Sequence, residues 1–155
     1  MNPFITKLQS ILGLALIAFS MTVGAAMAEM TGHMTGAHMF DKKMQPILER
    51  YLTIQETLAA DSTQNIRKLA KEIAADTTML NDNKIEGAHA EHYKGLPDKI
   101  KTAAITLSIA ANLETTRDAF KKLSMPMAMW GTMAKPKNVS VVFCSMAKGS
   151  WLQKQ

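Results

Sequence analysis

The sequence has little cysteine, few aromatic residues and no block of one charge, and each shortage excludes a class of protein. Cys144 is the single cysteine, so an internal disulfide cannot form. Lysine and arginine are scattered among acidic residues at a net charge of +5, without the basic, aromatic-interleaved runs typical of nucleic-acid binding. We find no glycine-rich phosphate loop, nucleophile elbow or H-E-x-x-H motif. We therefore expect neither a nucleic-acid partner nor an enzyme.

Long apolar runs are also scarce, and the one that stands out lies near the N-terminus. Lys7 precedes the run from Ile11 to Val23, and Ala26-Met27-Ala28 has the small-x-small pattern that signal peptidase cuts. A membrane anchor is disfavoured, because the run is short and ends at this pattern rather than at a stop-transfer cluster. We predict a signal peptide over residues 1–28, export to a bacterial periplasm, and no membrane span after cleavage.

Hydrophobic periodicity predicts two helices between Phe40 and the region around residue 80. Asp41 can cap the first helix, and Pro46 fits its first turn, where a missing N–H costs little. Ser62 is the expected N-cap of the second helix. The apolar positions that keep helical spacing, and are therefore expected to face inward, are Met44, Ile47, Leu48, Tyr51, Leu52, Leu58, Ile66, Leu69, Ala70, Ile73, Ala74 and Leu80.

Two more helices are predicted after a loop of polar residues and glycines over 81–97. Pro97 opens the third helix, and Asn112 caps the fourth, with Glu114 in its first turn. Pro126 should kink the fourth helix or end its regular part. The expected inward positions are Ile100, Ala103, Ala104, Leu107, Ala111, Leu113, Thr116, Phe120, Leu123 and Met127.

The fold class predicted from these patterns is all-α. The β-branched and aromatic stretch VSVVF, residues 139–143, indicates a short strand or extended segment after the last helix. We expect an antiparallel four-helix bundle over residues 40–155 with this short extended C-terminal segment laid across it. The expected organisation is a signal peptide over 1–28, a flexible tail over 29–39, and the helical-bundle domain over 40–155.

The stretch MTGHMTGAHM, residues 30–39, is the first candidate metal site. Thioether and imidazole groups favour Cu(I) and Ag(I) over hard, oxygen-preferring ions. Histidine-rich tracts of low complexity carry a bias toward metal binding, although a tolerant tail in which these residues do nothing is the alternative. The ligands that this stretch offers are Met30, His33, Met34, His38 and Met39.

Cys144 and Met146 form the second candidate site, in the stretch CSM. In an extended segment residues i and i+2 face the same side, so a thiolate and a thioether could bind one ion. The alternative is that Cys144 packs as a small apolar residue beside Phe143 and Trp151.

The C-terminal stretch FCSMAKGSWLQKQ resembles the C-P-M-A … G-x-x-W-L-Q signature of a bacterial exported domain of unknown function. That domain occurs alone or fused to periplasmic adaptor proteins of copper and silver efflux systems. Upstream, YLTIQETLAAD and LETTRDAFKKLS are similar to the helical segments of the family, so the resemblance covers about residues 47–155. It implies a helical domain associated with heavy-metal export and an efflux adaptor as a partner. The matching residues are Cys144, Met146, Trp151, Leu152 and Gln153.

The chain departs from the family pattern at two points. Ser145 stands where the family has proline, which removes a local stiffener of the turn. The sequence ends at Gln155, whereas the family continues through an N-P-Y-x-G segment to a second cysteine. A site or disulfide that needs this second cysteine is therefore not expected.

Two other groups of residues have alternative interpretations. Met125, Met129 and Met133 lie at i, i+4 and i+8 beside Trp130, which is typical of core packing or an adaptable contact surface, although the Trp130 ring could also receive a soft cation. His89, with His92 in the same stretch, could chelate Zn(II) or Cu(II) if the segment is helical. We expect these histidines to be solvated loop residues, because no further ligands accompany them.

The function predicted from the sequence is an exported protein that binds Cu(I) or Ag(I) in metal resistance or efflux. The N-terminal methionines and histidines would capture the ion, and Cys144 with Met146 would form a second site. The alternative is an interaction module that binds no metal and docks on an envelope or efflux adaptor protein through Met125–Met133 and Trp151. A third interpretation is a thiol-dependent redox role for Cys144.

Overall fold

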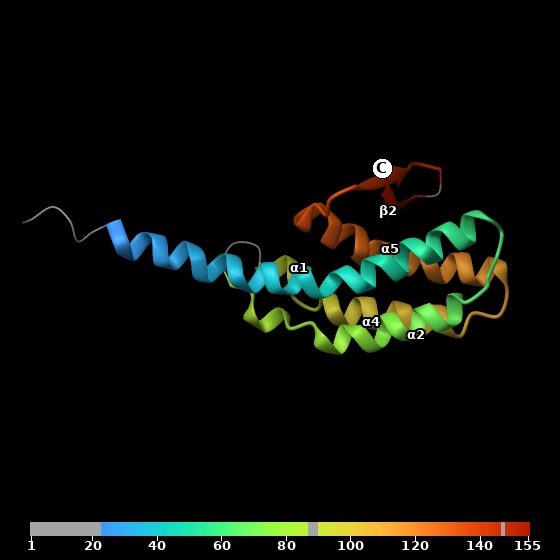
Figure 1. The fold of residues 1–155 in the computed structure, drawn as a ribbon. Coiled ribbons are helices and arrows are strands. Elements are labelled where there is room, and N and C mark those ends of the chain that lie inside the picture. Colours follow the sequence, from blue (N-terminus) through green and yellow to red (C-terminus); the bar gives the residue numbers. More distant parts are fainter. Residues whose placement is uncertain (1–22, 87–89, 147) are drawn as a thin grey trace, which may run out of the picture.

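The computed structural model describes residues 23–86, 90–146 and 148–155, and their side chains from Gly36 onward. The protein is mostly helical, with a small two-stranded antiparallel sheet at the C-terminal end (Figure 1). Helices therefore dominate the fold as predicted. The elements are α1 (Val23–Ala59), α2 (Ile66–Asp76), η1 (Thr77–Met79), η2 (Asp82–Lys84), α3 (Ala90–Tyr93), α4 (Leu96–Ser108), α5 (Leu113–Ala134), β1 (Val139–Cys144) and β2 (Gly149–Lys154).

Helix α1 begins well before Phe40, so the predicted start of the first helix is wrong. Residues 36–39, expected to belong to a flexible tail, are continuous with the rest of α1. Gly36 explains why, because its lack of a side chain lets the helix lie directly against the backbone of Lys84 and Ile85. Ala37 packs against the core, and Phe40 is buried. Packing thus outweighs the glycine signal that suggested a loop.

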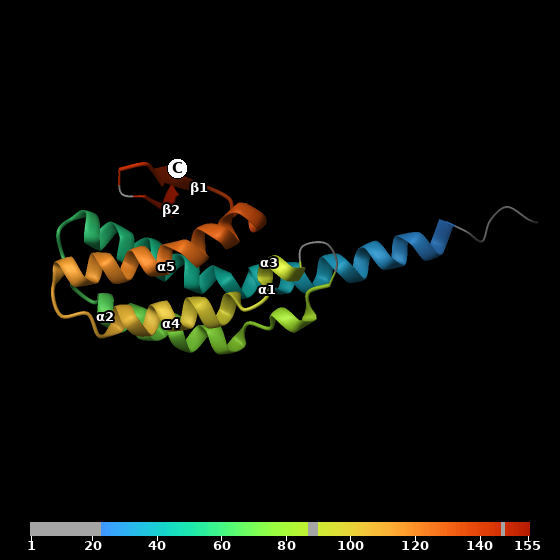
Figure 2. The same ribbon diagram turned by 180° about the vertical axis from the view of Figure 1, so that it is seen from behind.

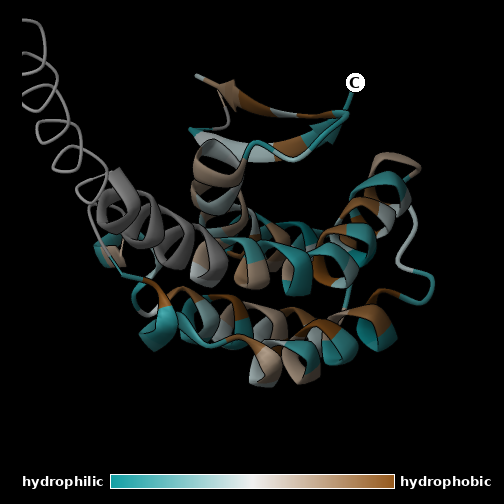
Figure 3. Ribbon diagram, turned by 60° about the vertical axis from the view of Figure 1, so that its left-hand side comes forward, coloured by the Kyte–Doolittle hydropathy of each residue, from teal (hydrophilic) through white to brown (hydrophobic). Residues whose placement is uncertain are grey.

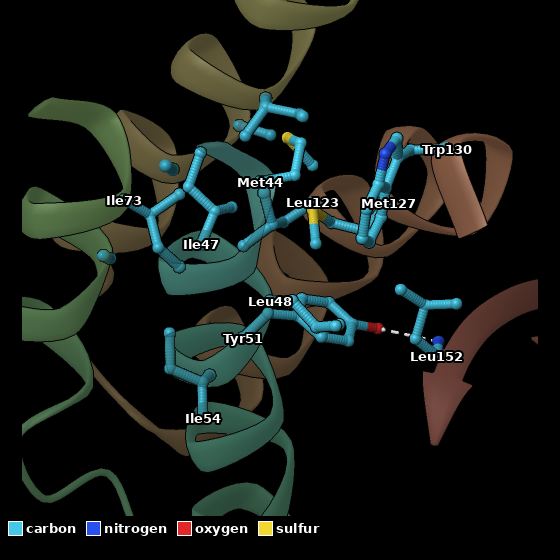
Figure 4. Packing of buried hydrophobic residues seen from close by; sticks show 14 of the residues in the cluster. Met44, Ile47, Leu48, Tyr51, Ile54, Ile73, Leu123, Met127, Trp130 and Leu152 are labelled. Atoms are coloured by element: carbon cyan, nitrogen blue, oxygen red, sulfur yellow. Dashed lines mark hydrogen bonds between the residues drawn. The ribbon is translucent and has the colours of Figure 1, made fainter. Parts of the chain in front are cut away.

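The inward faces of the helices are those that the periodicity predicts. Met44, Ile47, Tyr51, Leu123 and Met127 lie in the interior, where α1 meets α5 (Figure 4). Apolar residues of each helix turn toward this core and polar residues turn outward (Figure 3). Ala111 is the exception, because α4 ends at Ser108 and leaves Ala111 exposed in the turn that follows. Within the described part of the chain, no helix is both long and apolar enough to cross a membrane.

The predicted N-cap is confirmed at α5 and is wrong at α2. Asn112 caps α5 as predicted, in a reciprocal capping box with Thr115. Ser62 does not cap α2. Its hydroxyl accepts a hydrogen bond from the N–H of Gln64 inside the turn, and α2 starts only after Asn65, which adopts a left-handed conformation. Pro126 does not end α5, which continues to Ala134 with Pro126 buried.

The segment predicted as a long loop over 81–97 contains η2 and α3. The carboxylate of Asp82 accepts a hydrogen bond of 2.7 Å from the N–H of Gly95, which draws the two ends of the segment together. Gly95 has a φ of 69°, a left-handed conformation that glycine adopts at no steric cost, and α4 begins immediately after it. Tyr93 is buried edge-on against Phe40 at a centroid distance of 5.1 Å. The segment therefore packs on α1.

The C-terminal segment is a β-hairpin and not the single extended segment that we expected. VSVVF forms most of β1, as predicted, and β2 pairs with it in antiparallel register, with Val141 opposite Leu152. Strand β2 lies next to α5 and α1, and β1 lies on the far side of β2 (Figure 2). The side chain of Leu152 is buried against Gly131 of α5. β2 was missed because GSWLQK lacks the β-branched residues that mark β1.

Candidate functional site

The described part of the N-terminal methionine and histidine stretch lies on the surface of α1. His38 and Met39 are exposed, with Met39 at 50% of its full exposure. Met30, His33 and Met34 fall within α1, but their side chains lie outside those that the structure describes. These two side chains are therefore accessible to solvent.

Met79 is a second exposed thioether among the described side chains, and sequence reasoning did not identify it. The ammonium group of Lys43 donates a hydrogen bond of 2.9 Å to the carbonyl of Met79. Lys43 lies one helical turn after Met39, so this hydrogen bond ties the backbone of Met79 to the same part of α1 through the lysine side chain. The side chain of Met79 is 62% exposed. Its position arises from η1, the short 3-10 helix that follows α2, and has no local sequence signal.

Asp41 anchors α1 to α5 at the next turn of the helix. Its carboxylate accepts a hydrogen bond of 2.8 Å from the indole N–H of Trp130 and a longer one of 3.4 Å from the hydroxyl of Tyr93. Asp41 was predicted to be an N-cap. The prediction is wrong, because α1 continues through this position and the carboxylate points to other elements instead. The anchor fixes the part of α1 that carries His38 and Met39.

Burial shifts the pKa of both acidic groups of this anchor upward. Partial burial raises the pKa of Asp41 above its usual 3.8, while the hydrogen bonds from Trp130 and Tyr93 and the charge of His38 act in the opposite direction. Burial and the neighbouring Asp41 carboxylate raise the pKa of Tyr93 to about 12. The phenol of Tyr93 therefore remains neutral and continues to donate to Asp41 at neutral pH.

The structure does not provide the extended geometry on which the Cys144 and Met146 site was based. β1 ends at Cys144, and Ser145 and Met146 belong to the turn that leads to β2. The side chain of Cys144 is partly buried, whereas Met146 is 91% exposed. The argument from alternating strand positions therefore does not apply to this pair. A site here would depend on the conformation of the turn.

The methionine stripe on α5 combines packing with exposure. α5 continues through Met125, Met129 and Met133; Met125 is exposed, and the other two pack partly against the core. Trp130 is fully buried and its N–H is bonded to Asp41. Its ring is therefore part of the core, in agreement with the packing interpretation.

The histidines of the segment before α4 were expected to be solvated. His92 lies on α3 and is exposed, and His89 lies outside the described residues. Glu91, beside it, forms an ion pair of 3.7 Å with Lys94. Among the residues that the structure describes, no three or more histidine, cysteine and acidic side chains are grouped so that they could hold an ion.

A surface depression of about 480 Å³ lies between α1 and α2. Its rim includes Thr53 and Thr57, but both hydroxyls donate to carbonyls of their own helix. Nearby, Arg50 joins the two helices through hydrogen bonds to Glu72 and Asp76, at 2.9 and 2.7 Å. The threonine hydroxyls are thus used within α1, and Arg50 with its two acidic partners holds α1 and α2 together. Neither set is arranged around a ligand site.

The fold and these surfaces define a small, mostly helical protein whose helical core is closed at one side by a C-terminal hairpin. The exposed sulfur and imidazole side chains among the described residues include His38 and Met39 on α1, Met79 at the end of η1 and Met146 in the turn after β1. The chain belongs to the family described as "Protein of unknown function (DUF3347)", whose model matches residues 47–138. The match ends before β1, so Cys144 and the WLQ stretch lie beyond it. Comparison with curated proteins and with solved structures gives no match.

Proposed function

We propose that this protein is exported to the periplasm and binds Cu(I) or Ag(I) as part of metal resistance or efflux. The observation that supports this proposal is the exposure of His38 and Met39 on one turn of α1. Met79, also exposed, is tied to the same helix through the hydrogen bond from Lys43 to its carbonyl. The proposed ligand set also includes Met30, His33 and Met34, which precede His38 on α1.

The chemistry of these ligands favours a monovalent soft ion. Thioether sulfur binds Cu(I) and Ag(I), and imidazole adds a stronger donor, whereas neither group suits a hard divalent ion such as magnesium. Each thioether bond is individually weak, so an ion can be exchanged through intermediates of low coordination. Cys144 and Met146 would form a second site through the conformation of the turn after β1, and the N-terminal ligands would deliver the ion to it. The resemblance of the C-terminal stretch to the C-P-M-A and W-L-Q signature, and the association of that family with efflux adaptors, support the same proposal.

The experiment that tests this proposal is a Cu(I) competition titration against a chromophoric chelator under reducing conditions. The first variant replaces Met30, Met34 and Met39 by leucine and His33 and His38 by glutamine, changes that keep side-chain size close to the original. Met79→Leu and Cys144→Ser are titrated separately. Met125→Leu serves as the matched control, because Met125 is an exposed thioether far along the chain from the proposed ligands.

Each result of the titration has a clear meaning. We expect the five-fold substitution to lose most of the bound copper, Met79→Leu to weaken binding, and Met125→Leu to leave it unchanged. Loss with Cys144→Ser alone would transfer the main site to the C-terminal turn. If the unmodified protein does not compete with even a weak chelator, the metal proposal is wrong.

A second candidate function is a docking module that binds an envelope or efflux adaptor protein without metal. The exposure of large apolar side chains favours it, since Met125, Val141, Phe143 and Met146 all lie open to solvent. An antiparallel four-helix bundle, which we propose as the arrangement of the long helices, would hold these surfaces rigidly. A partner captured equally by the wild type and by the metal-ligand variants would support docking over metal delivery.

A further inference from the structure

The C-terminal hairpin has one covered edge and one open edge. β2 faces the helices, and the N–H of its Leu152 donates a hydrogen bond of 3.2 Å to the hydroxyl of Tyr51. β1 lies on the side of β2 away from the helices (Figure 2), except at its start, where Val139 packs partly against the core. The sheet formed by the described residues has only these two strands. The outer edge of β1 is therefore without a neighbouring strand.

The register shows which backbone groups of β1 point off this edge. In an antiparallel pair, successive residues direct their N–H and C=O groups alternately toward and away from the partner strand. The N–H of Gln155 donates to the carbonyl of Asn138, and the N–H of Leu152, opposite Val141, points away from β1. Both observations show that Asn138 and every second residue after it direct their backbone groups toward β2, and that the residues between them direct theirs away from it. The outward-directed groups belong to Val139, Val141 and Phe143.

Nothing in the sequence of β1 protects this edge against pairing. Natural edge strands carry charged side chains, proline or bulges that prevent another strand from adding to them. VSVVFC has no charge and no proline, and its six residues pair with β2 without interruption. Val141 is 42% exposed and Phe143 is 68% exposed. An added strand would bury these side chains as well as satisfy the free backbone groups.

The charged side chains of the C-terminal segment all have one sign, and Lys154 of β2 is the one that pairs with an acidic residue, Glu56 of α1, among the described residues. The sequence contains no aspartate or glutamate after Asp118, whereas six lysines follow that position. Lys137 precedes β1 and Lys148 lies in the turn beyond it; both are exposed, and neither forms an ion pair within the described residues. The two ends of the open edge are therefore positive, which selects a partner of negative charge.

We propose that the open edge of β1 binds an extended acidic segment of another protein, which adds to the sheet as a third strand. Backbone hydrogen bonds to Val139, Val141 and Phe143 would supply affinity, and carboxylates near Lys137 and Lys148 would supply selectivity. A second copy of this chain fits less well, since antiparallel self-pairing brings Lys137 of one copy beside Lys148 of the other. The inference rests on the docking function and is independent of metal binding.

The probe is a synthetic peptide in which valine and glutamate alternate, compared with one in which valine and lysine alternate. We expect the acidic peptide to bind the full chain, with affinity that falls as salt increases, and the basic peptide not to bind. Amide hydrogen exchange should slow at Val139, Val141 and Phe143 on binding. The amides of Ser140 and Val142 already face β2 and should change little. This alternating pattern is specific to strand addition.

Two substitutions at one position provide the matched comparison. Val141→Pro removes an N–H that points off the edge and leaves the hydrogen bonds to β2 intact, so the hairpin should persist. Val141→Thr keeps that N–H. We expect the proline variant to lose about tenfold or more in affinity, because it loses a backbone hydrogen bond to the peptide and its ring blocks the approach of the added strand. The threonine variant should lose much less. Exchange of the Leu152 amide reports whether the hairpin is intact.

Several outcomes would overturn the inference. Equal binding of both peptides, uniform protection along β1, or unchanged binding by Val141→Pro with an intact hairpin would each exclude strand addition. Dimerisation that Val141→Pro abolishes, without peptide binding, would identify a second copy as the occupant. Binding to anionic lipid vesicles but not to the peptide would identify a membrane surface. If an envelope partner is captured equally by wild type and Val141→Pro, the docking function stands and this edge is not its site.

Discussion

The hydroxyl of Tyr51 accepts a hydrogen bond from the backbone N–H of Leu152, 101 positions away in the sequence. The same hydroxyl lies 2.8 Å from the Oγ of Ser124, and its ring stacks on Phe120 at a centroid distance of 4.9 Å. Burial raises the pKa of Tyr51 to about 12, so the hydroxyl keeps its proton over the whole physiological range. One side chain of α1 thus fixes both α5 and the hairpin.

Replacing Tyr51 by phenylalanine should loosen the hairpin first. The change leaves the N–H of Leu152 without its acceptor in a buried position, and such a loss costs about 1–3 kcal/mol. We expect a lower free energy of unfolding in urea and faster amide exchange throughout β2. Tyr93→Phe is the control, because it removes a tyrosine hydroxyl that bonds Asp41 and not the hairpin. Equal acceleration of β2 exchange in both variants would contradict the assigned role of Tyr51.

Gly131 should be intolerant of a methyl group despite its position in a helix. A Cβ atom there would overlap the side chain of Leu152, which is itself buried. Alanine improves helix propensity by about 1 kcal/mol over glycine, whereas overpacking a filled core costs about 1–3 kcal/mol. We expect Gly131→Ala to be destabilising overall and Gly131→Ala with Leu152→Ala to show strong non-additivity. Urea unfolding of the single and double variants measures this coupling, and simple additivity would contradict it.

The helical faces could be predicted from the sequence because they depend on local spacing. Met44, Ile47 and Tyr51 repeat at intervals of three and four, and all are buried as the period requires. The start of α1 and the strand β2 could not be predicted, since each depends on a distant surface. Gly36 packs against Lys84, and Leu152 packs against Gly131, contacts that leave no local pattern. Met79 was not predicted as a candidate ligand for the same reason, because its position also depends on a contact with a residue distant in the sequence, Lys43.

Removing the Asn112 cap should destabilise α5 by a modest and measurable amount. The side chain of Asn112 accepts a hydrogen bond of 2.9 Å from the N–H of Thr115, and the hydroxyl of Thr115 returns the interaction. Loss of an N-cap typically costs about 1 kcal/mol. We expect Asn112→Ala to lower the free energy of unfolding by this amount and Asn112→Asp to retain most of it. Ala111→Ser, one position earlier and exposed, should have no effect.

The partly buried carboxylate of Asp41 should make the protein less stable as the pH rises. A salt-bridged carboxylate would have the opposite effect. Burial raises the pKa of Asp41 in the folded protein above its unfolded value of 3.8, so the folded state holds the proton more tightly. The contribution is therefore fully present below pH 3.8 and is lost as the pH rises through the raised pKa. Asp41→Asn keeps an oxygen acceptor for Trp130 and removes the titration. We expect this variant to gain stability relative to the wild type as the pH rises from 3.8 toward neutrality.

Urea unfolding at a series of pH values measures this difference in stability between Asp41→Asn and the wild type. The control is Asp118→Asn, which replaces an exposed carboxylate on α5. A difference between Asp41→Asn and the wild type that is constant with pH would mean that the charge on Asp41 does not oppose folding.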